Sequence, residues 1–453
     1  MKKLLLLLLL TSTFAYAQFT INGTMNPPYK SNWILLYKIE GARQIFVKNT
    51  KSKTDTILVN GQKKAIATFK IQLPATAKPG SYRITYDTKS GGFVDFLFNK
   101  ENVSFTFNPS FPEQSINYSS SKENILYKEY SHAIYIAQKK LDSIQVSVFQ
   151  QPSTTASNNY KNALKKLSNV QDIYLEKSKG MMANHYIKAT FRKNSPEIIL
   201  SAKKYLSFIK KNFFANIDFS NKKLYNSSFL VDRITDYIFY LNSSDHTGEQ
   251  QKLYIESISN VMYNITDPTF KKDVIEFLVT QFAAQKNVDI VDLLFNNYYK
   301  RLPVGLKNEV FKTEKLAQLA AEIGRTAPDF SWQENGKKYQ LSTLKDANSY
   351  VLVFWSAGCS HCLREIPELY TFMKDRKQTS VIAFSLEKTD YNWKNYIKKL
   401  SGWHNVMGLN KWKNKTARTY QIFSTPTYFI LDKNKKIIAK PDTIQDVIAY
   451  FGE

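Results

Sequence analysis

The chain of 453 residues carries a formal net charge of +25 and contains two cysteines, Cys359 and Cys362. Its length predicts two or three domains, and its content of 43% hydrophobic and 14% aromatic residues excludes a disordered chain. A fold held together by disulfides is also excluded, because a bridge between cysteines three positions apart would close too small a loop to add much stability.

The positive charge is spread along the chain. Nine of the 63 basic residues are arginines, and the lysines do not gather in one stretch. Proteins that read nucleic acids concentrate charge and use arginine at base edges. We therefore expect a solvated basic surface and no nucleic-acid partner, with attraction to an anionic membrane surface or acidic partners as the alternative.

Residues 1–17 have the pattern of a secretory signal peptide. A basic start at 1–3 precedes a leucine run at 4–10, and Ala15-Tyr16-Ala17 is a small-x-small cleavage site. The apolar run is short for a transmembrane helix, so an uncleaved anchor is the weaker alternative. No cysteine lies near the cleavage point, so we expect a periplasmic protein that begins at Gln18 and is not a lipoprotein.

Residues 18–112 read as a small antiparallel β-sandwich. Short runs that are apolar or alternate between apolar and polar, such as 33–38, 65–71 and 103–107, predict strands. Strand-breaking signals separate them, and these are Asn22-Gly23, Asn60-Gly61, Pro79-Gly80 and Gly91-Gly92.

Residues 113–322 read as an all-α region. Apolar residues at helical spacing predict a helix over Lys122–Gln151, and the polar stretch 151–159 predicts a loop. Ser195-Pro196 and Asp267-Pro268 each combine a capping residue with a proline in the first turn, so a helix is predicted to start at each. The isolated histidines of this region, His132, His185 and His246, are interpreted as structural or exposed.

Residues 323–453 alternate between strands and helices and predict an α/β domain. Tyr350–Trp355 is wholly apolar, as expected of a strand covered on both faces. The other predicted strands are 380–386, 427–431 and 436–440, and the predicted helices are 359–374, 393–400 and 442–450.

The two cysteines lie where the strand that ends at Trp355 meets the helix that follows. This is the arrangement of a redox-active Cys-x-x-Cys pair, and an exported protein meets an oxidising compartment. Cys359 at the amino end of the helix faces unpaired N–H groups and the positive end of the helix dipole, which lower the pKa of a thiol. Cys362, one turn further, is placed to resolve a mixed disulfide. Ser360 and His361 between them are expected to tune the pKa of Cys359.

The carboxyl-terminal domain resembles the TlpA/ResA-like thiol–disulfide oxidoreductases of the thioredoxin superfamily. The resemblance is carried by Ala-Pro-Asp-Phe at 327–330, Val-Phe-Trp-x-x-x-Cys-x-x-Cys at 353–362, Glu365 and Thr425-Pro426-Thr427. It covers about the last 130 residues and implies a thioredoxin-like fold there. The preceding regions resemble, more weakly, the long amino-terminal extensions of such proteins in Bacteroidetes-type bacteria.

The resemblance also assigns roles to residues. It implies that Pro426 is a cis-proline and that Thr425, Pro426 and Trp355 bind substrate. It implies that Glu365 transfers a proton to or from Cys362; an exposed carboxylate paired with a basic neighbour is the alternative. The buried aspartate of thioredoxins is replaced by Val353. No cofactor is implied beyond the redox-active Cys359–Cys362 disulfide.

Three functions compete at this point. The resemblance favours a reductase of disulfides in exported proteins, supplied with electrons by a membrane thiol donor. His361 before the second cysteine, where the family often has proline, favours an oxidase or isomerase instead. A copper or zinc chaperone that uses both cysteines and His404 is a weaker alternative, so no metal site is predicted.

Overall fold

The structure is a computed structural model that describes residues 18–89, 91–151 and 155–452. The predicted signal peptide and its cleavage site lie outside these residues. The chain divides into two compact units, up to Val274 and from Ile275 onward, so the predicted helical region 113–322 is shared between them. In the described part of the chain, no helix combines the length and apolarity that a membrane crossing requires.

The first unit begins with two β-sheets packed face to face. Their facing side chains, among them Ile21, Phe69 and Phe105 from one sheet and Ile84 and Phe96 from the other, form a single buried core. One sheet has the order β4 (Lys53–Val59), β5 (Gln62–Pro74), β1 (Gln18–Met25), β8 (Val103–Phe107) and β9 (Asn117–Ser120), and the other has the order β3 (Arg43–Lys51), β2 (Trp33–Glu40), β6 (Gly80–Asp87) and β7 (Gly92–Phe98).

Two details of the predicted sandwich are wrong. β1 pairs in parallel with β8, so the sandwich is not wholly antiparallel. The predicted turn at Asn22-Gly23 is absent, because β1 runs through both residues to Met25. Gly23 serves close packing instead: a Cβ atom there would lie 2.0 Å from the ring of Phe69.

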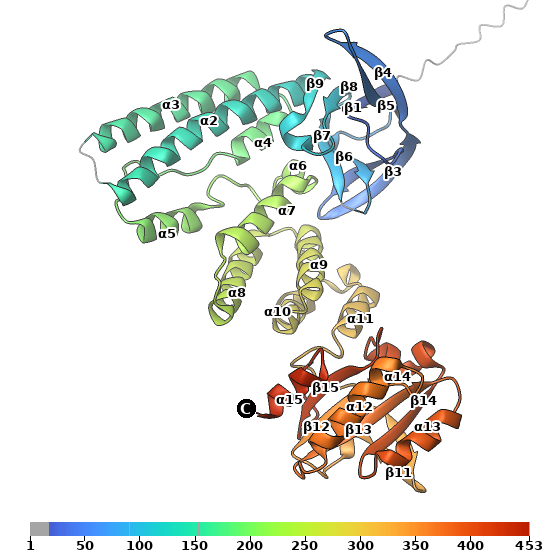
Figure 1. The fold of residues 1–453 in the computed structure, drawn as a ribbon. Helices are drawn as coiled ribbons and strands as arrows, with labels where there is room; N and C mark the ends of the chain where they lie inside the picture. Colours follow the sequence, from blue (N-terminus) through green and yellow to red (C-terminus); the bar gives the residue numbers. More distant parts are fainter. Residues whose placement is uncertain (1–17, 90, 152–154, 453) are drawn as a thin grey trace, which may run out of the picture. The chain divides into compact units, whose positions relative to one another are not determined.

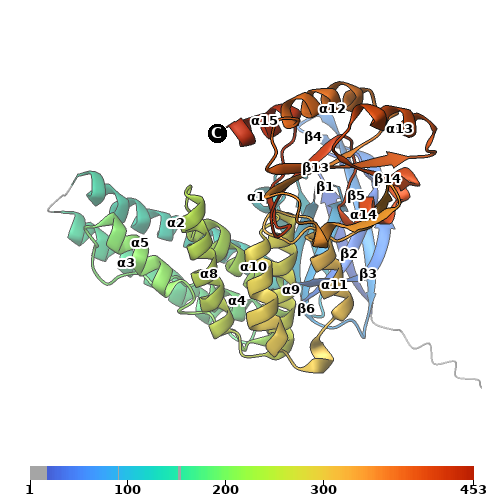
Figure 2. The same ribbon diagram turned by 90° about the horizontal axis from the view of Figure 1, so that it is seen from below.

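The helices of the first unit follow the sandwich, and α2 and α3 lie side by side (Figures 1 and 2). The start of α2 is fastened to β7, since the Asn124 amide bonds both the N–H and the C=O of Leu97 at 2.8 and 2.7 Å. The helices of this unit are α1 (Pro112–Ser115), α2 (Lys122–Gln150), α3 (Ala156–Lys177), α4 (Ala183–Ala189), α5 (Ala202–Asn212), α6 (Lys222–Tyr225), α7 (Ser228–Thr235), α8 (Thr247–Asn264) and α9 (Pro268–Ala284), which continues into the second unit.

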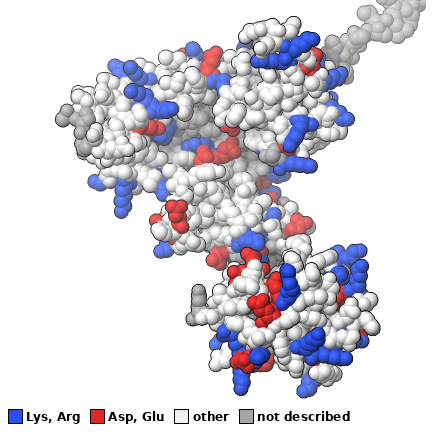
Figure 3. Space-filling view, viewed as in Figure 1, with Lys and Arg blue, Asp and Glu red and all other residues white. Residues whose placement is uncertain are grey.

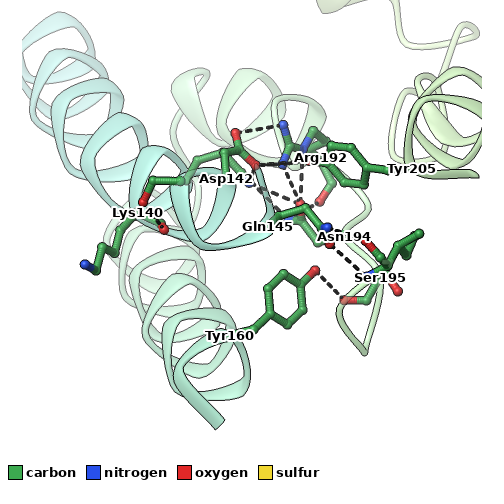
Figure 4. A network of polar contacts seen from close by, with 11 residues as sticks. Lys140, Asp142, Gln145, Tyr160, Arg192, Asn194, Ser195 and Tyr205 are labelled. Atoms are coloured by element: carbon green, nitrogen blue, oxygen red, sulfur yellow. Dashed lines mark hydrogen bonds and ion pairs between the residues drawn. The ribbon is translucent and has the colours of Figure 1, made fainter. Parts of the chain in front are cut away.

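The helix predicted to start at Ser195-Pro196 begins later. Residues 191–200 are irregular, and α5 starts at Ala202 with Ser201 as its cap. The irregular segment is held by side chains of α2 and α3 (Figure 4): Gln145 bonds the N–H and C=O of Ile199 at 3.0 and 2.6 Å, and Tyr160 donates to the Ser195 carbonyl at 2.9 Å. These long-range partners satisfy backbone groups that a helix would otherwise pair internally. Helix α3, by contrast, begins inside the predicted loop 151–159.

The second unit contains a five-stranded mixed sheet of order β14-β13-β12-β15-β16. Both faces of the sheet are covered by separate apolar cores. Helices α12, α13 and α15 cover one face, and α14 lies on the other (Figure 2). The elements are α10 (Val288–Leu293), α11 (Glu309–Gln318), β10 (Ser331–Glu334), β11 (Lys337–Gln340), β12 (Ser349–Trp355), α12 (Ser360–Met373), β13 (Thr379–Glu387), α13 (Tyr391–Tyr396), β14 (His404–Leu409), α14 (Lys415–Thr419), β15 (Thr427–Asp432), β16 (Ile437–Ala439) and α15 (Ile444–Gly452).

The predicted strands and helices of residues 323–453 are all present, within a few residues of their expected ends. The hairpin β10–β11, the edge strand β14 and the short helix α14 were not predicted. The helices before this domain belong to it structurally: Arg325 makes two hydrogen bonds to Asp292, at 2.6 and 2.7 Å, and Gln421 donates to the Gln318 carbonyl at the end of α11.

Candidate active site

The two cysteines occupy the junction between β12 and α12. β12 is buried along its length and ends at Trp355. Cys359 is the cap of α12, and its sulfur accepts a hydrogen bond from the Cys362 N–H at 3.4 Å. Both cysteines are free thiols; Cys359 is partly exposed, and Cys362 is buried. The Cys359 thiol is therefore accessible to a partner, whereas the Cys362 thiol is covered by the protein.

The surroundings of the two thiols shift their pKa values in opposite directions. Partial burial would raise the pKa of Cys359, but hydrogen bonds from the Cys362 thiol and from the N–H groups of Cys362 and His361 outweigh it, so this pKa is lowered. Burial, together with the hydrogen bond to Cys359, raises the pKa of Cys362 to about 12. Because the thiolate is the reactive form of a cysteine, Cys359 is the more reactive of the two thiols at neutral pH.

The segment before β15 lies against Cys359. The Cys359 sulfur is 3.4 Å from the carbonyl oxygen of Thr425, and the peptide bond between Thr425 and Pro426 is cis, as predicted. Thr425 and Pro426 are both partly exposed. A polypeptide that reaches the sulfur therefore meets this backbone at the same time.

Glu365 lies one turn after Cys362 on α12. Its Oε2 accepts a hydrogen bond from the hydroxyl of Tyr428 at 2.8 Å, and Tyr428 is fully buried on β15. Burial, the hydrogen bond to Glu365 and the charges of Glu365 and Cys362 raise the pKa of Tyr428. Glu365 is thus a carboxylate oriented by a phenol near Cys362, rather than one paired with a basic neighbour on the helix surface.

Three other residues with predicted roles in the site, Trp355, Ser360 and His361, have side chains that are buried in the core or exposed at the surface. The Trp355 side chain is fully buried and packs against Tyr396 with 5.1 Å between ring centroids, so its position does not support the predicted contact with substrate. Ser360 and His361 are exposed. The contribution of His361 to the acidity of Cys359 comes through its backbone N–H.

A buried carboxylate that the sequence reading missed supports the junction from below. Glu387 ends β13 and is 6% exposed. It accepts hydrogen bonds from the Ala357 N–H at 2.6 Å, the Ser385 hydroxyl at 2.5 Å and the Ser356 hydroxyl at 3.3 Å. The carbonyl of Ser356 in turn accepts from the Cys359 N–H at 3.1 Å. Glu387 therefore holds the loop that carries Cys359.

His404, the histidine of the metal-chaperone alternative, is not placed to bind a metal together with the two cysteines. Both ring nitrogens of His404 are engaged, with Glu334 at 3.1 Å and Asp346 at 3.0 Å. Across the sheet His404 is level with Leu352, three residues before the end of β12, which places it about 10 Å from that end. His404 is thus bound elsewhere and does not join the cysteines.

Comparison with known proteins places this domain. Residues 323–440 match the model of the AhpC/TSA family. A protein named thiol-disulfide oxidoreductase ResA from Bacillus thuringiensis subsp. konkukian is 34% identical over 121 residues, which cover 26% of this chain and 68% of the relative. The chain belongs to the ResA-like thiol–disulfide oxidoreductases.

One more relative and one solved structure are similar to the carboxyl-terminal domain. The protein of the same name from Geobacillus thermodenitrificans is 27% identical over 144 residues, which cover 30% of this chain and 79% of the relative. A solved domain described as a possible thiol-disulfide isomerase, from Cytophaga hutchinsonii, is 33% identical and covers 29% of this chain and 90% of its own, with a TM-score of 0.26. This protein is thus a ResA-like thiol–disulfide oxidoreductase with about 300 preceding residues.

The contrast between the two thiols predicts selective alkylation. At pH 7, a limiting amount of iodoacetamide should modify Cys359 and leave Cys362 intact, because Cys359 is accessible and its pKa is lowered, whereas the pKa of Cys362 is about 12. As the pH is raised, the rate of Cys359 alkylation should reach its plateau at a lower pH than for an ordinary thiol, whose pKa is about 8.5. Peptide mass spectrometry locates the label, and equal modification of both cysteines would contradict the assignment.

The role of Glu387 predicts a second outcome. Glu387→Ala leaves the Ala357 N–H without its partner, so the free energy of unfolding should fall by about 1–3 kcal/mol and insulin reduction should slow. Urea denaturation and a turbidity assay measure the two effects. Glu314→Ala, at an exposed site on α11, is the matched control and should change neither. Unchanged stability and rate in Glu387→Ala would show that the loop does not depend on this carboxylate.

Proposed function

We propose that this protein is exported to the periplasm and reduces disulfides of exported proteins through the Cys359–Cys362 dithiol. The observation that carries the proposal is the difference between an accessible thiol of lowered pKa and a buried thiol of raised pKa one helical turn away. Export is supported by the signal-peptide pattern of residues 1–17.

The reaction follows from this arrangement. The Cys359 thiolate attacks one sulfur of a substrate disulfide; a Cys359–substrate disulfide forms, and the other substrate sulfur leaves as a thiolate and is protonated. Cys362 then loses its proton, attacks the Cys359 sulfur and displaces the second substrate sulfur as a thiolate, which is protonated in turn. The substrate has gained two electrons and two protons, and the enzyme holds a Cys359–Cys362 disulfide. A membrane thiol donor is proposed to return two electrons and restore the dithiol.

Two further residues have proposed roles: Glu365 in the deprotonation of Cys362, and Phe423 in the binding of a polypeptide substrate. Glu365 is the proposed acceptor of the Cys362 proton, because a thiol with a pKa of about 12 requires a base to react at neutral pH. Phe423, two residues before Thr425, is 86% exposed and offers an apolar contact to a polypeptide that pairs with the Thr425 backbone.

A disulfide oxidase or isomerase is the second candidate function, favoured by His361 between the cysteines. In those enzymes a strongly stabilised thiolate raises the reduction potential. The His361 side chain is exposed here, and its backbone N–H is the group that acts on Cys359. This geometry favours the reductase.

Mixed-disulfide trapping tests the reductase proposal. Cells that produce Cys362→Ser should accumulate covalent adducts between Cys359 and exported proteins, because the resolving thiol is gone. Alkylation followed by non-reducing gels and mass spectrometry identifies the partners, and Cys359→Ser/Cys362→Ser is the control without a nucleophile. The proposal fails if no reducible adduct forms and the wild-type protein also fails to reduce insulin.

The reduction potential separates the two directions of electron flow. Equilibration with glutathione buffers should give a value near that of thioredoxin, about −270 mV, for a reductase. A value between about −120 and −180 mV would establish the oxidase or isomerase instead.

A further inference from the structure

The first unit contains a cavity of about 510 Å³ between the sandwich and the helices that follow it. Strand β7 and helices α1, α2 and α7 contribute its walls, and the volume is typical of sites that enclose a ligand or a large side chain. Asn124 fastens α2 to β7, and the Ser228 hydroxyl fastens α7 to β7 through Asp95 at 2.7 Å. The cavity is therefore bounded by elements that are bonded to one another.

One wall of the cavity is aromatic. Tyr127 contacts Tyr186 edge to face with 6.1 Å between ring centroids, and Tyr186 contacts Phe229 in the same way at 6.2 Å. Phe93 and Tyr118 line the cavity as well. Such a continuous ring surface binds flat apolar groups and, through the negative faces of the rings, organic cations.

The cavity also contains carboxylates, one of them already bound to a guanidinium. Arg83 makes two hydrogen bonds to Asp95, at 2.6 and 2.8 Å, while its guanidinium lies 3.6 Å from the centroid of the Phe93 ring. Asp95 is thereby paired with a positive charge. This pair shows, with the chain's own residues, how a guanidinium is held here between a carboxylate and an aromatic face.

Asp232 lies one turn after Ser228 on α7 and lines the same cavity. Ser228 hydrogen-bonds to its carboxylate, and the charges of Arg83 and Asp95 act on it in opposite directions, but among the residues that the structure describes no lysine or arginine forms an ion pair with it. Lys128, which also lines the cavity, donates instead to the Glu113 carbonyl at 2.7 Å. Glu113 adds a second exposed carboxylate at the edge. Figure 3 shows acidic side chains in a hollow of the first unit, with basic side chains beside them and others scattered over the largely uncharged surface around it.

We propose that this cavity binds an arginine side chain of a polypeptide, with the guanidinium at Asp232 and its plane against the aromatic wall. A polypeptide fits better than a free small molecule, because a second hollow of about 420 Å³ shares Phe93, Pro112 and Glu113 with the cavity and extends it towards Tyr29 and Gly91. In this proposal the second hollow holds residues that flank the arginine. The site does not involve the cysteines, so it is independent of the proposed redox chemistry.

Calorimetry on the chain from Gln18 onward tests this with three probes. They are acetyl-Gly-Gly-Arg-Gly-Gly-amide, the same peptide with neutral citrulline in place of arginine, and acetyl-arginine amide. The arginine peptide should bind, and loss of the charge in the citrulline peptide should weaken binding about tenfold or more. Acetyl-arginine amide should bind more weakly than the peptide, since it reaches only the cavity.

Variants locate the site. Asp232→Asn should weaken the arginine peptide about tenfold, and Tyr127→Leu, which removes the ring face, should weaken it several-fold. Asp245→Asn, at an exposed aspartate outside the cavity, is the matched control and should bind like the wild type. Circular dichroism confirms that each variant is folded, and Glu113→Gln is the reserve variant should Asp232→Asn fail to fold.

Several results would overturn the proposal. They are equal affinity for the arginine and citrulline peptides, unchanged binding in folded Asp232→Asn, or no measurable binding of the arginine peptide. Equal affinity for acetyl-arginine amide would overturn the assignment to a polypeptide. A variant with both cysteines changed to serine should bind the arginine peptide normally, so loss of redox activity and loss of this site are measured separately.

Discussion

The position of Cys359 depends on the burial of strand β12 in the centre of the carboxyl-terminal sheet. Its residues pair with β13 on one side and β15 on the other, and apolar cores cover both faces. A strand held in this way ends at a fixed place, so the three residues between Trp355 and Cys359 place this cysteine at the start of α12. The two neighbouring strands add one contact each. Glu387 at the end of β13 binds the Ala357 N–H in the loop before Cys359, and the carbonyl of Thr425, just before β15, lies beside the Cys359 sulfur.

Much of this domain could be predicted from sequence because its signals are local. The wholly apolar run 350–355, the Cys-x-x-Cys spacing and the helical pattern after it each lie within a few residues. Together they predict the strand, the helix and the position of the two thiols at their junction. The pairing of Glu365 with Tyr428 was beyond such reasoning, because the two residues are 63 positions apart. Glu387 was missed for the same reason: a glutamate at a strand end reads as exposed until the register between β12 and β13 places it under Ser356 and Ala357.

The first unit shows the opposite balance. Its strands and long helices follow local patterns, but the joints between them are single polar side chains that bond the backbone of distant segments. Gln145 with Ile199 and Asn124 with Leu97 are examples. The helix predicted from Ser195 fails because Gln145 and Tyr160 offer its backbone better partners than the next turn would. A capping pattern indicates whether a segment tends to form a helix by itself, whereas these tertiary contacts determine its conformation in the folded unit.

The register between β12 and β15 has a consequence for the surroundings of Cys359. Phe354 lies opposite Thr427, and the Thr425 carbonyl, two residues before Thr427, lies 3.4 Å from the Cys359 sulfur. The environment of this thiol is therefore set by the pairing of two strands as well as by the helix that begins at it. A change in the sheet far from the cysteines that shifted this pairing would displace a polar group from the sulfur without altering any residue of the Cys-x-x-Cys segment.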